Sequence, residues 1–283
     1  MAEGAPVDVA TVLCQWAAGG LAYLWVTTRR REVGLGYGWL LRSLYGVIAA
    51  VGAVAGLVFQ PNAVRDVACI AMALCAVATL VRSAVPNEAA ASHDVGVGDA
   101  GSDGGAPAGP APRRTIEGFD PRWDLAAPLA GMVGVVAAGL GSSGDIAPTL
   151  HLARVVVGTA FLGVVSNSML LGHWYLVQPG LRREPLRELV RHLGGLWPIE
   201  VGLLLLPTGM IAVLTGSIDD GYGGLLGWFW AACAVTTVAL AAVAMAALRE
   251  RQYAAVMAAT GLLYLAILTG FGTDLVARLT LAG

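Results

Sequence analysis

Two ionisable residues of this sequence lie inside long apolar stretches, where they are placed to do chemistry. His173 stands between Leu-Leu-Gly and Trp-Tyr, and Glu200 is the only carboxylate well inside its stretch. Hydrocarbon penalises an ionisable side chain, so such a residue is a functional candidate. A buried carboxylate beside a histidine can exchange protons. The same two groups could also hydrogen-bond the carbonyl oxygens of a quinone.

Polar residues recur along the stretch that carries the histidine. Thr159, Ser166 and His173 are seven residues apart, which places them on one face of a helix. The candidate ligand-binding residues are the histidine, the glutamate and their polar and aromatic neighbours: His173, Glu200, Asn167, Ser166, Trp174 and Tyr175. Two alternatives stay open: hydrogen bonds between helices for the Ser and Asn side chains, and the interfacial aromatic belt for Trp and Tyr.

Haem is the alternative cofactor, and it would need histidines at matching depth. Of the four histidines, His173 and His192 fall in the same half of the membrane, at unequal depths. They are the weak haem-ligand candidates, and the chain offers a single haem near the cytoplasmic face at most. The four cysteines lie in apolar stretches without CxxC spacing, so no other metal site is predicted.

The elements that position these residues are apolar runs of about 20 residues, the length that crosses a hydrocarbon core of ~30 Å. With 57% hydrophobic and 13% charged residues, the composition excludes a water-soluble fold. The runs do not alternate in polarity as barrel strands do. We therefore predict an all-α polytopic bundle of eight transmembrane helices, at 11–28, 39–59, 65–82, 125–142, 151–178, 193–215, 223–248 and 253–277.

The arginines orient this bundle, because positive flanks stay in the cytoplasm. With both termini outside, fourteen of the 17 basic residues, all arginine, face the cytoplasm. Counted at 1.5 Å per residue from the helix boundaries at Pro179 and His192, His173 and Glu200 then lie ~9–12 Å inside the cytoplasmic face. Consecutive antiparallel helices would bring the two together. The arginine-only, Gly-rich and Ala-rich composition indicates a bacterium, and therefore its inner membrane.

One long connection divides the chain. Residues 1–82 carry three helices, 83–124 form a cytoplasmic linker that is disordered around 86–112, and 125–283 carry five helices of the same membrane domain. No internal repeat is evident, and three plus five helices do not match the equal halves of inverted-repeat transporters. The glycine-rich segment 34–38 is predicted to be a turn. Asp274 is expected to pair with Arg278, four residues on.

These features favour a membrane subunit of a redox or respiratory assembly with a quinone-type or haem-type pocket near the cytoplasmic leaflet. The alternatives are a proton-coupled small-molecule permease in which Glu200 titrates, and a non-catalytic assembly or scaffold protein. Few charges within the spans, unequal halves and unbroken helices argue against the permease. The expected partners are the lipid bilayer and other membrane subunits. A net charge of −2 excludes nucleic acid, and no loop outside the linker could hold a soluble active site.

Overall fold

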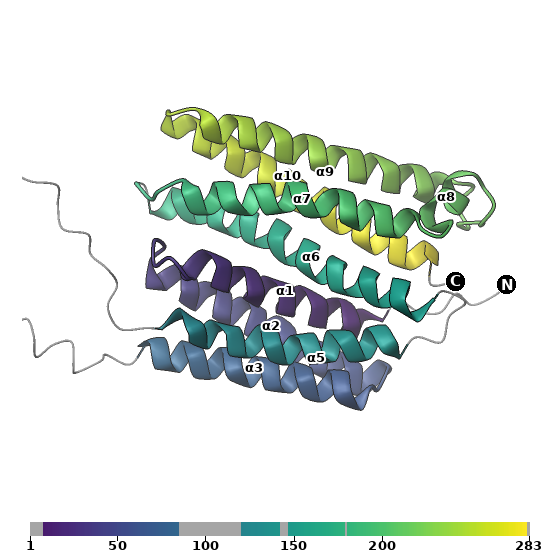
Figure 1. Ribbon diagram of the computed structural model, residues 1–283, viewed down its shortest axis with the longest axis horizontal. Helices are drawn as coiled ribbons and strands as arrows, with labels where there is room; N and C mark the ends of the chain where they lie inside the picture. Colours follow the sequence, from purple (N-terminus) through teal and green to yellow (C-terminus); the bar gives the residue numbers. More distant parts are fainter. Residues whose placement is uncertain (1–7, 85–119, 142–146, 179, 282–283) are drawn as a thin grey trace, which may run out of the picture.

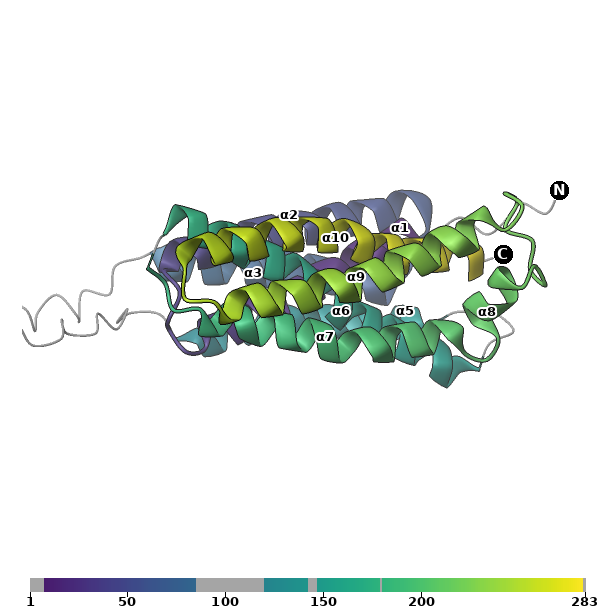
Figure 2. The same cartoon turned by 90° about the horizontal axis from the view of Figure 1, so that it is seen from above.

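The computed structural model describes residues 8–84, 120–141, 147–178 and 180–281, and these ranges contain helices and no strand (Figure 1). The long helices run nearly parallel to one another (Figures 1 and 2). In chain order the elements are α1 (Val9–Thr28), α2 (Leu35–Phe59), α3 (Ala63–Ala84), the 3₁₀ helix η1 (Pro121–Leu125), α5 (Ala126–Leu140), α6 (Pro148–Val177), α7 (Glu184–Leu205), α8 (Gly209–Leu214), α9 (Leu225–Arg249) and α10 (Tyr253–Leu281).

Seven helical segments of the described chain are long and apolar enough to cross a membrane: α1, α2, α3, η1 with α5, α6, α9 and α10. The prediction of a multi-pass helical membrane bundle is thereby confirmed. The eighth long helix, α7, does not meet the same measure because its first two turns carry charged side chains, among them Glu184, Arg187 and Arg191. It nevertheless packs against α6 and α9 within the bundle.

The sixth predicted span, 193–215, differs from the structure at both ends. Helix α7 begins at Glu184, where an acidic first residue followed by Pro185 suits a helix N-terminus. The helix ends at Leu205, because Pro207 has no N–H to continue the hydrogen-bonding pattern. The separate helix α8 follows. What was predicted as one span is therefore a longer helix, a break at residues 206–208 and a short helix.

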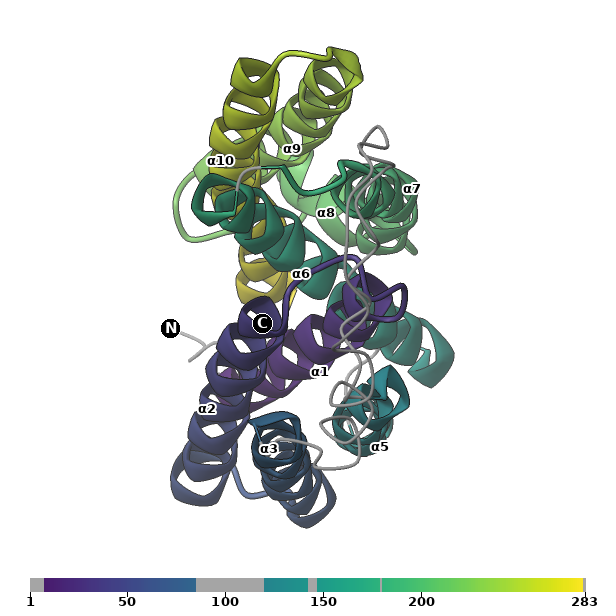
Figure 3. The same cartoon turned by 90° about the vertical axis from the view of Figure 1, so that its left-hand side faces the viewer.

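The helices pack as two rings of four. Helices α1, α2, α3 and α5 form the first ring, in which each helix contacts the next and α5 returns to α1. Helices α6, α7, α9 and α10 form the second ring in the same way. Figure 3 looks along the helices and shows that the chain passes round both rings in the same sense. Corresponding helices also point the same way (Figure 1), so a half-turn about an axis along the helices roughly superposes the rings.

The shared helix order of the two rings is not visible as a repeat in the sequence, which predicts a division into three and five helices. The rings meet where α1 packs against α6, with α5 also touching α6. A Cβ atom added to Gly19 would lie 1.9 Å from the carbonyl oxygen of Thr159, and one added to Gly163 would lie 2.2 Å from the carbonyl carbon of Gly19. Two glycines therefore let the backbones of the rings touch, as small residues do in membrane helix pairs.

The long connection follows α3 and precedes η1, and both of these elements belong to the first ring. Residues 83–84 are the last residues of α3, and Asp120 is the residue before η1. Helix η1 continues directly into α5. The predicted disordered segment around 86–112 lies outside the described residues. In space, the connection joins two neighbouring helices of one ring, and the boundary between the rings falls between α5 and α6.

Candidate functional site

His173 lies on the surface of the bundle and is paired with a tyrosine. Its Nδ1 atom is 2.8 Å from the hydroxyl of Tyr264 on α10, and the two rings meet edge to face with centroids 6.1 Å apart. Both side chains are exposed on the outer surface of the second ring. The histidine therefore faces the surroundings of the bundle and not its interior.

Glu200 lies elsewhere, in the interior of the second ring. It is 1% exposed, and its electrostatic partners are Asp274, Arg278 and Arg154. Asp274 follows Tyr264 by ten residues on α10, which is ~15 Å along the helix axis. Glu200 is thus at a different depth from His173, and the predicted pocket between these two residues is not formed.

The error in depth arose from the start of α7. Because the helix begins at Glu184, Glu200 is sixteen residues inside it, ~24 Å from that end. His173 is four residues from the end of α6, or ~6 Å. The prediction had counted from His192, which lies eight residues inside the helix. A charged, amphipathic first half of α7 had been assigned to a loop.

Ser166 and Asn167 are fully buried and join helices. The amide nitrogen of Asn167 donates to the carbonyl of Gly20 on α1 at 3.0 Å and to the hydroxyl of Tyr45 on α2 at 3.1 Å. The indole N–H of Trp16 donates to the Ser166 hydroxyl at 2.9 Å. These contacts match the interhelical alternative for the polar face of α6. A ligand-binding role for either residue stays a prediction.

Trp174 and Tyr175 turn toward α2 and the connection after α6. The indole N–H of Trp174 donates to Gln178 at 3.1 Å, and its ring lies 6.0 Å from that of Tyr37. The buried Tyr175 hydroxyl donates to the carbonyl of Arg182. Neither ring has a described contact with His173, so the pair does not form the predicted flanks of a ring-shaped ligand at that histidine.

The two haem-ligand candidates face different helices. The ring of His192 lies 5.9 Å from that of Tyr23 on α1, whereas His173 faces α10. Axial ligation by both histidines would require them to converge on one metal position. The described contacts do not bring them together.

The Glu200 cluster contains five side chains: Glu200 with its charged neighbours Arg154, Asp274 and Arg278, and Gln15 of α1, which lies beside the Asp274–Arg278 pair. Arg154 donates through Nε to the carbonyl of Leu203 at 2.9 Å and through Nη2 to that of Leu206. These carbonyls have no helical partner because α7 ends there. The guanidinium therefore caps the break between α7 and α8.

The predicted ion pair of Asp274 and Arg278 is present and two-pronged, with N–O distances of 2.6 and 2.8 Å. Asp274 is buried at 3% exposure. Gly158 on α6 leaves room for this pair, since an added Cβ would lie 3.2 Å from both partners. Gln15 reaches the same place from α1, where its Nε2 donates to the carbonyl of Val155 at 2.5 Å. Residues of both rings thus meet in the cluster.

Two oxygen atoms of the Glu200 cluster are unsatisfied. Glu200 Oε2 and Gln15 Oε1 are buried and have no hydrogen-bond partner within the described ranges. The two arginines and two carboxylates of the cluster cancel in formal charge. The arrangement can therefore accept a proton or another hydrogen-bond donor without any charged group first losing its own partner.

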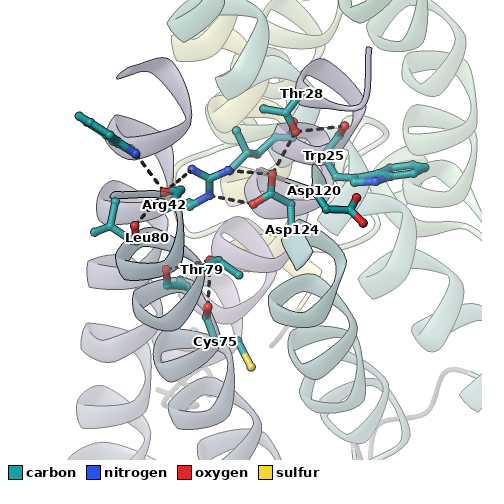
Figure 4. Close-up of polar contacts among 12 residues, drawn as sticks. Trp25, Thr28, Arg42, Cys75, Thr79, Leu80, Asp120 and Asp124 are labelled. Carbon is teal, nitrogen blue, oxygen red and sulfur yellow. Dashed lines mark hydrogen bonds and ion pairs between the residues drawn. The ribbon is translucent and has the colours of Figure 1, made fainter. Parts of the chain in front are cut away.

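The first ring holds a contrasting pair at the end where α1 leads into α2 (Figure 4). Arg42 donates through Nε and Nη2 to the two oxygens of Asp124, at 2.7 and 2.9 Å. The hydroxyl of Thr28 donates to the same carboxylate at 3.0 Å. Both charged side chains are almost fully buried. Helices α2 and η1 are thus joined by a pair whose carboxylate oxygens are both engaged.

The glycine-rich segment 34–38, predicted to be a turn, is instead the N-cap residue and the first turn of α2. Gly34 precedes the helix, and a Cβ on Gly38 would lie 2.8 Å from the Arg42 guanidinium. A Cβ on Gly36 would lie 3.1 Å from Trp174. These glycines therefore make room for neighbouring side chains. A small open hollow beside them is lined by Thr28, Arg31 and Pro121, among others.

No protein family model, curated protein or solved structure matches this chain. Function must therefore be argued from the arrangement of these groups.

Proposed function

We propose that the chain is a small-molecule permease in which Glu200 exchanges protons during transport. The observation that carries the proposal is a buried carboxylate with an unpaired oxygen, five residues before its own helix ends at Leu205. Ionisable groups kept inside a membrane protein typically serve ion or substrate pathways. Broken helices expose backbone groups at such sites. Here Arg154 satisfies the freed carbonyls, which leaves Glu200 as the group able to titrate.

The duplicated fold supports the same proposal. Parallel repeats related by an axis along the membrane normal are a recurring plan among transporters, and their sites lie between the repeats. The Glu200 cluster combines Gln15 of the first ring with side chains of α6, α7 and α10 in the second. The arguments against a permease from unequal halves and unbroken helices do not apply to this fold. Charged side chains such as Arg154 and Asp274 are also buried within the bundle, whereas the sequence predicted few charges inside the spans.

A quinone-type site in a redox assembly is the second candidate. The His173–Glu200 pair on which it was predicted is not formed, but the exposed His173–Tyr264 pair favours it independently. Two hydrogen-bonding side chains on the outer surface of a membrane bundle are within reach of a quinone dissolved in the lipid. A quinone in the lipid extract of the wild-type protein, absent after His173→Ala, would establish this candidate.

The proposed topology has eight spans, with α7 as the eighth and both termini outside a bacterial inner membrane. It is supported by the arginine distribution and by α1 beginning and α10 ending at the same end of the bundle (Figure 1). Labelling of single cysteines placed in the α1–α2 and α2–α3 turns would test it. If the α1–α2 turn is labelled from outside intact cells, the proposed orientation is wrong and the opposite one holds.

The permease is tested with purified protein in liposomes that contain a pH-sensitive dye. A pH gradient is imposed in the presence of a defined mixture of amino acids, amines, carboxylates and sugars, and the contents are identified by mass spectrometry. We expect wild-type protein to accumulate at least one compound together with a dye response, and Glu200→Gln to do neither. Glu250→Gln, beyond the end of α9, is the matched control. Wild-type vesicles that behave as empty ones would overturn the proposal.

A further inference from the structure

The missing hydrogen-bond partners in the Glu200 cluster are of one chemical kind. Glu200 Oε2 and Gln15 Oε1 are both acceptors, on side chains that are 1% and 0% exposed. The amide of Gln15 is fixed in orientation, because only its nitrogen can donate to the carbonyl of Val155. What these two oxygens lack is therefore a donor.

The two arginines of the cluster are not available to an anion. Arg278 is held in a two-pronged pair by Asp274. Arg154 is held by the carbonyls of Leu203 and Leu206. An anionic ligand would have to displace a carboxylate from one guanidinium or leave the freed carbonyls of α7 unpaired, and both changes are costly. Despite its two arginines, the cluster is suited to a donor and not to an acceptor.

The corresponding end of the first ring carries a charged cluster whose groups are all engaged. Arg65 on α3 donates to Asp66, to Asp8 before α1 and to the carbonyl of Gln60. Gly134 on α5 lies beside it, since an added Cβ would be 3.3 Å from the Arg65 carbonyl oxygen. The Glu200 cluster differs because two of its buried oxygens have no described partner.

We propose that Glu200 and Gln15 bind the ammonium group of a small cationic substrate, which competes with a proton for Glu200. An ammonium has three N–H donors, which is the kind of group that each of the two oxygens lacks. As the cation binds, the O–H bond of a protonated Glu200 breaks and its proton passes to water; the reverse occurs on release. One carboxylate that holds either ion, but not both, couples their movement in opposite directions. This inference rests on the proposed permease.

The test is calorimetric titration of the detergent-purified full chain with methylammonium, in two buffers of different ionisation enthalpy. We expect saturable binding that strengthens with pH, accompanied by release of up to one proton per cation. Tetramethylammonium, with the same charge but no N–H donor, and acetate should not bind. Glu200→Gln should abolish binding. Gln15→Leu should weaken it about tenfold, the effect of losing one hydrogen bond to a charged group. Gln252→Leu, on the exposed turn before α10, is the matched control.

The outcomes separate this inference from the permease itself. Equal binding of methylammonium and tetramethylammonium, or binding unchanged by Glu200→Gln, would overturn the assigned site. Proton-linked uptake of a compound without an amine, with no methylammonium binding, would overturn the substrate class and leave the permease standing. Methylammonium binding without uptake of any compound would keep the site and remove the permease. Should Gln15→Leu fail to fold, Gln15→Asn, which shortens the same amide, must show the weakened binding.

Discussion

The two rings of this protein treat buried charge differently. In the first ring, both carboxylate oxygens of Asp124 accept hydrogen bonds from Arg42, and both oxygens of Asp66 are likewise engaged, by Arg65 and the N–H of Asn62. In the second ring, Glu200 keeps one buried oxygen without a described partner. A fully satisfied buried pair joins helices, whereas an unsatisfied one has capacity left for a ligand. The second ring also contains an engaged pair, Asp274 with Arg278, so the contrast lies in Glu200.

The largest effect should come from breaking the pair in the first ring. Arg42→Ala leaves the buried Asp124 carboxylate without its main partner, and we expect it to cost about 3–5 kcal/mol in the free energy of unfolding. Unfolding in mixed micelles would measure it. The double variant Arg42→Met with Asp124→Leu should recover most of the loss. Arg82→Ala, whose exposed guanidinium stacks on Trp123 at 4.4 Å, should cost about 1 kcal/mol or less. Equal losses of unfolding free energy for Arg42→Ala and Arg82→Ala would contradict a structural role for the Arg42–Asp124 pair.

A smaller loss is expected where the rings meet. Gly163→Ala places a methyl group against the backbone of Gly19, which must move away, and overpacking of this kind costs about 1–3 kcal/mol. Gly261→Ala on α10 is the control, because an added Cβ there meets nothing within 4 Å. The same unfolding assay compares the two. If Gly163→Ala leaves the free energy of unfolding unchanged, the contact between Gly19 and Gly163 does not hold the rings together.

The matched exchange of a carboxylate for an amide tests the comparison most directly. Glu200→Gln should change the free energy of unfolding by about 1 kcal/mol or less, because it removes a charge without breaking a described hydrogen bond of Oε2. Asp124→Asn should instead approach the loss of Arg42→Ala, since an amide N–H₂ then faces the guanidinium. Losses of the same size in both variants would make Glu200 structural and remove the support for the proposed permease.

The smallest effect concerns the loop between α8 and α9, which has no counterpart in the first ring. The backbone N–H of Gly224, with those of Tyr222 and Leu226, holds the pKa of the Asp220 carboxyl below its usual value. A lowered pKa in the folded state stabilises the protein above the unfolded value of ~3.9, and this contribution is lost as pH falls through the lower folded pKa.

Asp220→Asn should therefore lower the melting temperature slightly at pH 7. The difference from wild type should shrink as the pH falls from about 4 toward 3. Asp219→Asn, whose carboxylate accepts a single described backbone N–H, should lower the melting temperature less at pH 7. A difference between Asp220→Asn and wild type that is constant with pH would mean that ionisation of this carboxyl does not stabilise the loop.

The sequence predicted most of the fold because membrane spans are set by the length of apolar runs. It failed at α7, where Arg187, Glu188 and Arg191 indicated a loop although a helix with a charged face continues through them. It also missed the similar arrangement of the two rings, since helix packing leaves little trace in residue identity. The triplet Arg-Arg-Glu occurs at 30–32, ahead of α2, and at 182–184, where Glu184 is the first residue of α7.

The candidate site was predictable to the extent that it depends on local spacing. Glu200 was found as a lone carboxylate in an apolar run, and the Asp274–Arg278 pair was found from its spacing of four. Arg154 was missed because its partners are backbone carbonyls that a helix break sets free, and sequence spacing does not reveal them. The depth error at α7 produced the false pairing of His173 with Glu200. To predict from sequence that two residues on neighbouring helices lie at the same depth, the boundaries of both helices must be known.

The even number of helices in each ring has a consequence for how the two rings follow one another. A four-helix unit begins and ends at the same end of the bundle, so the second ring starts at the end where the first one started (Figure 1). Corresponding helices therefore point the same way without any reversal between the rings. The close contact of Gly19 with Gly163 joins the first helices of the two rings, α1 and α6.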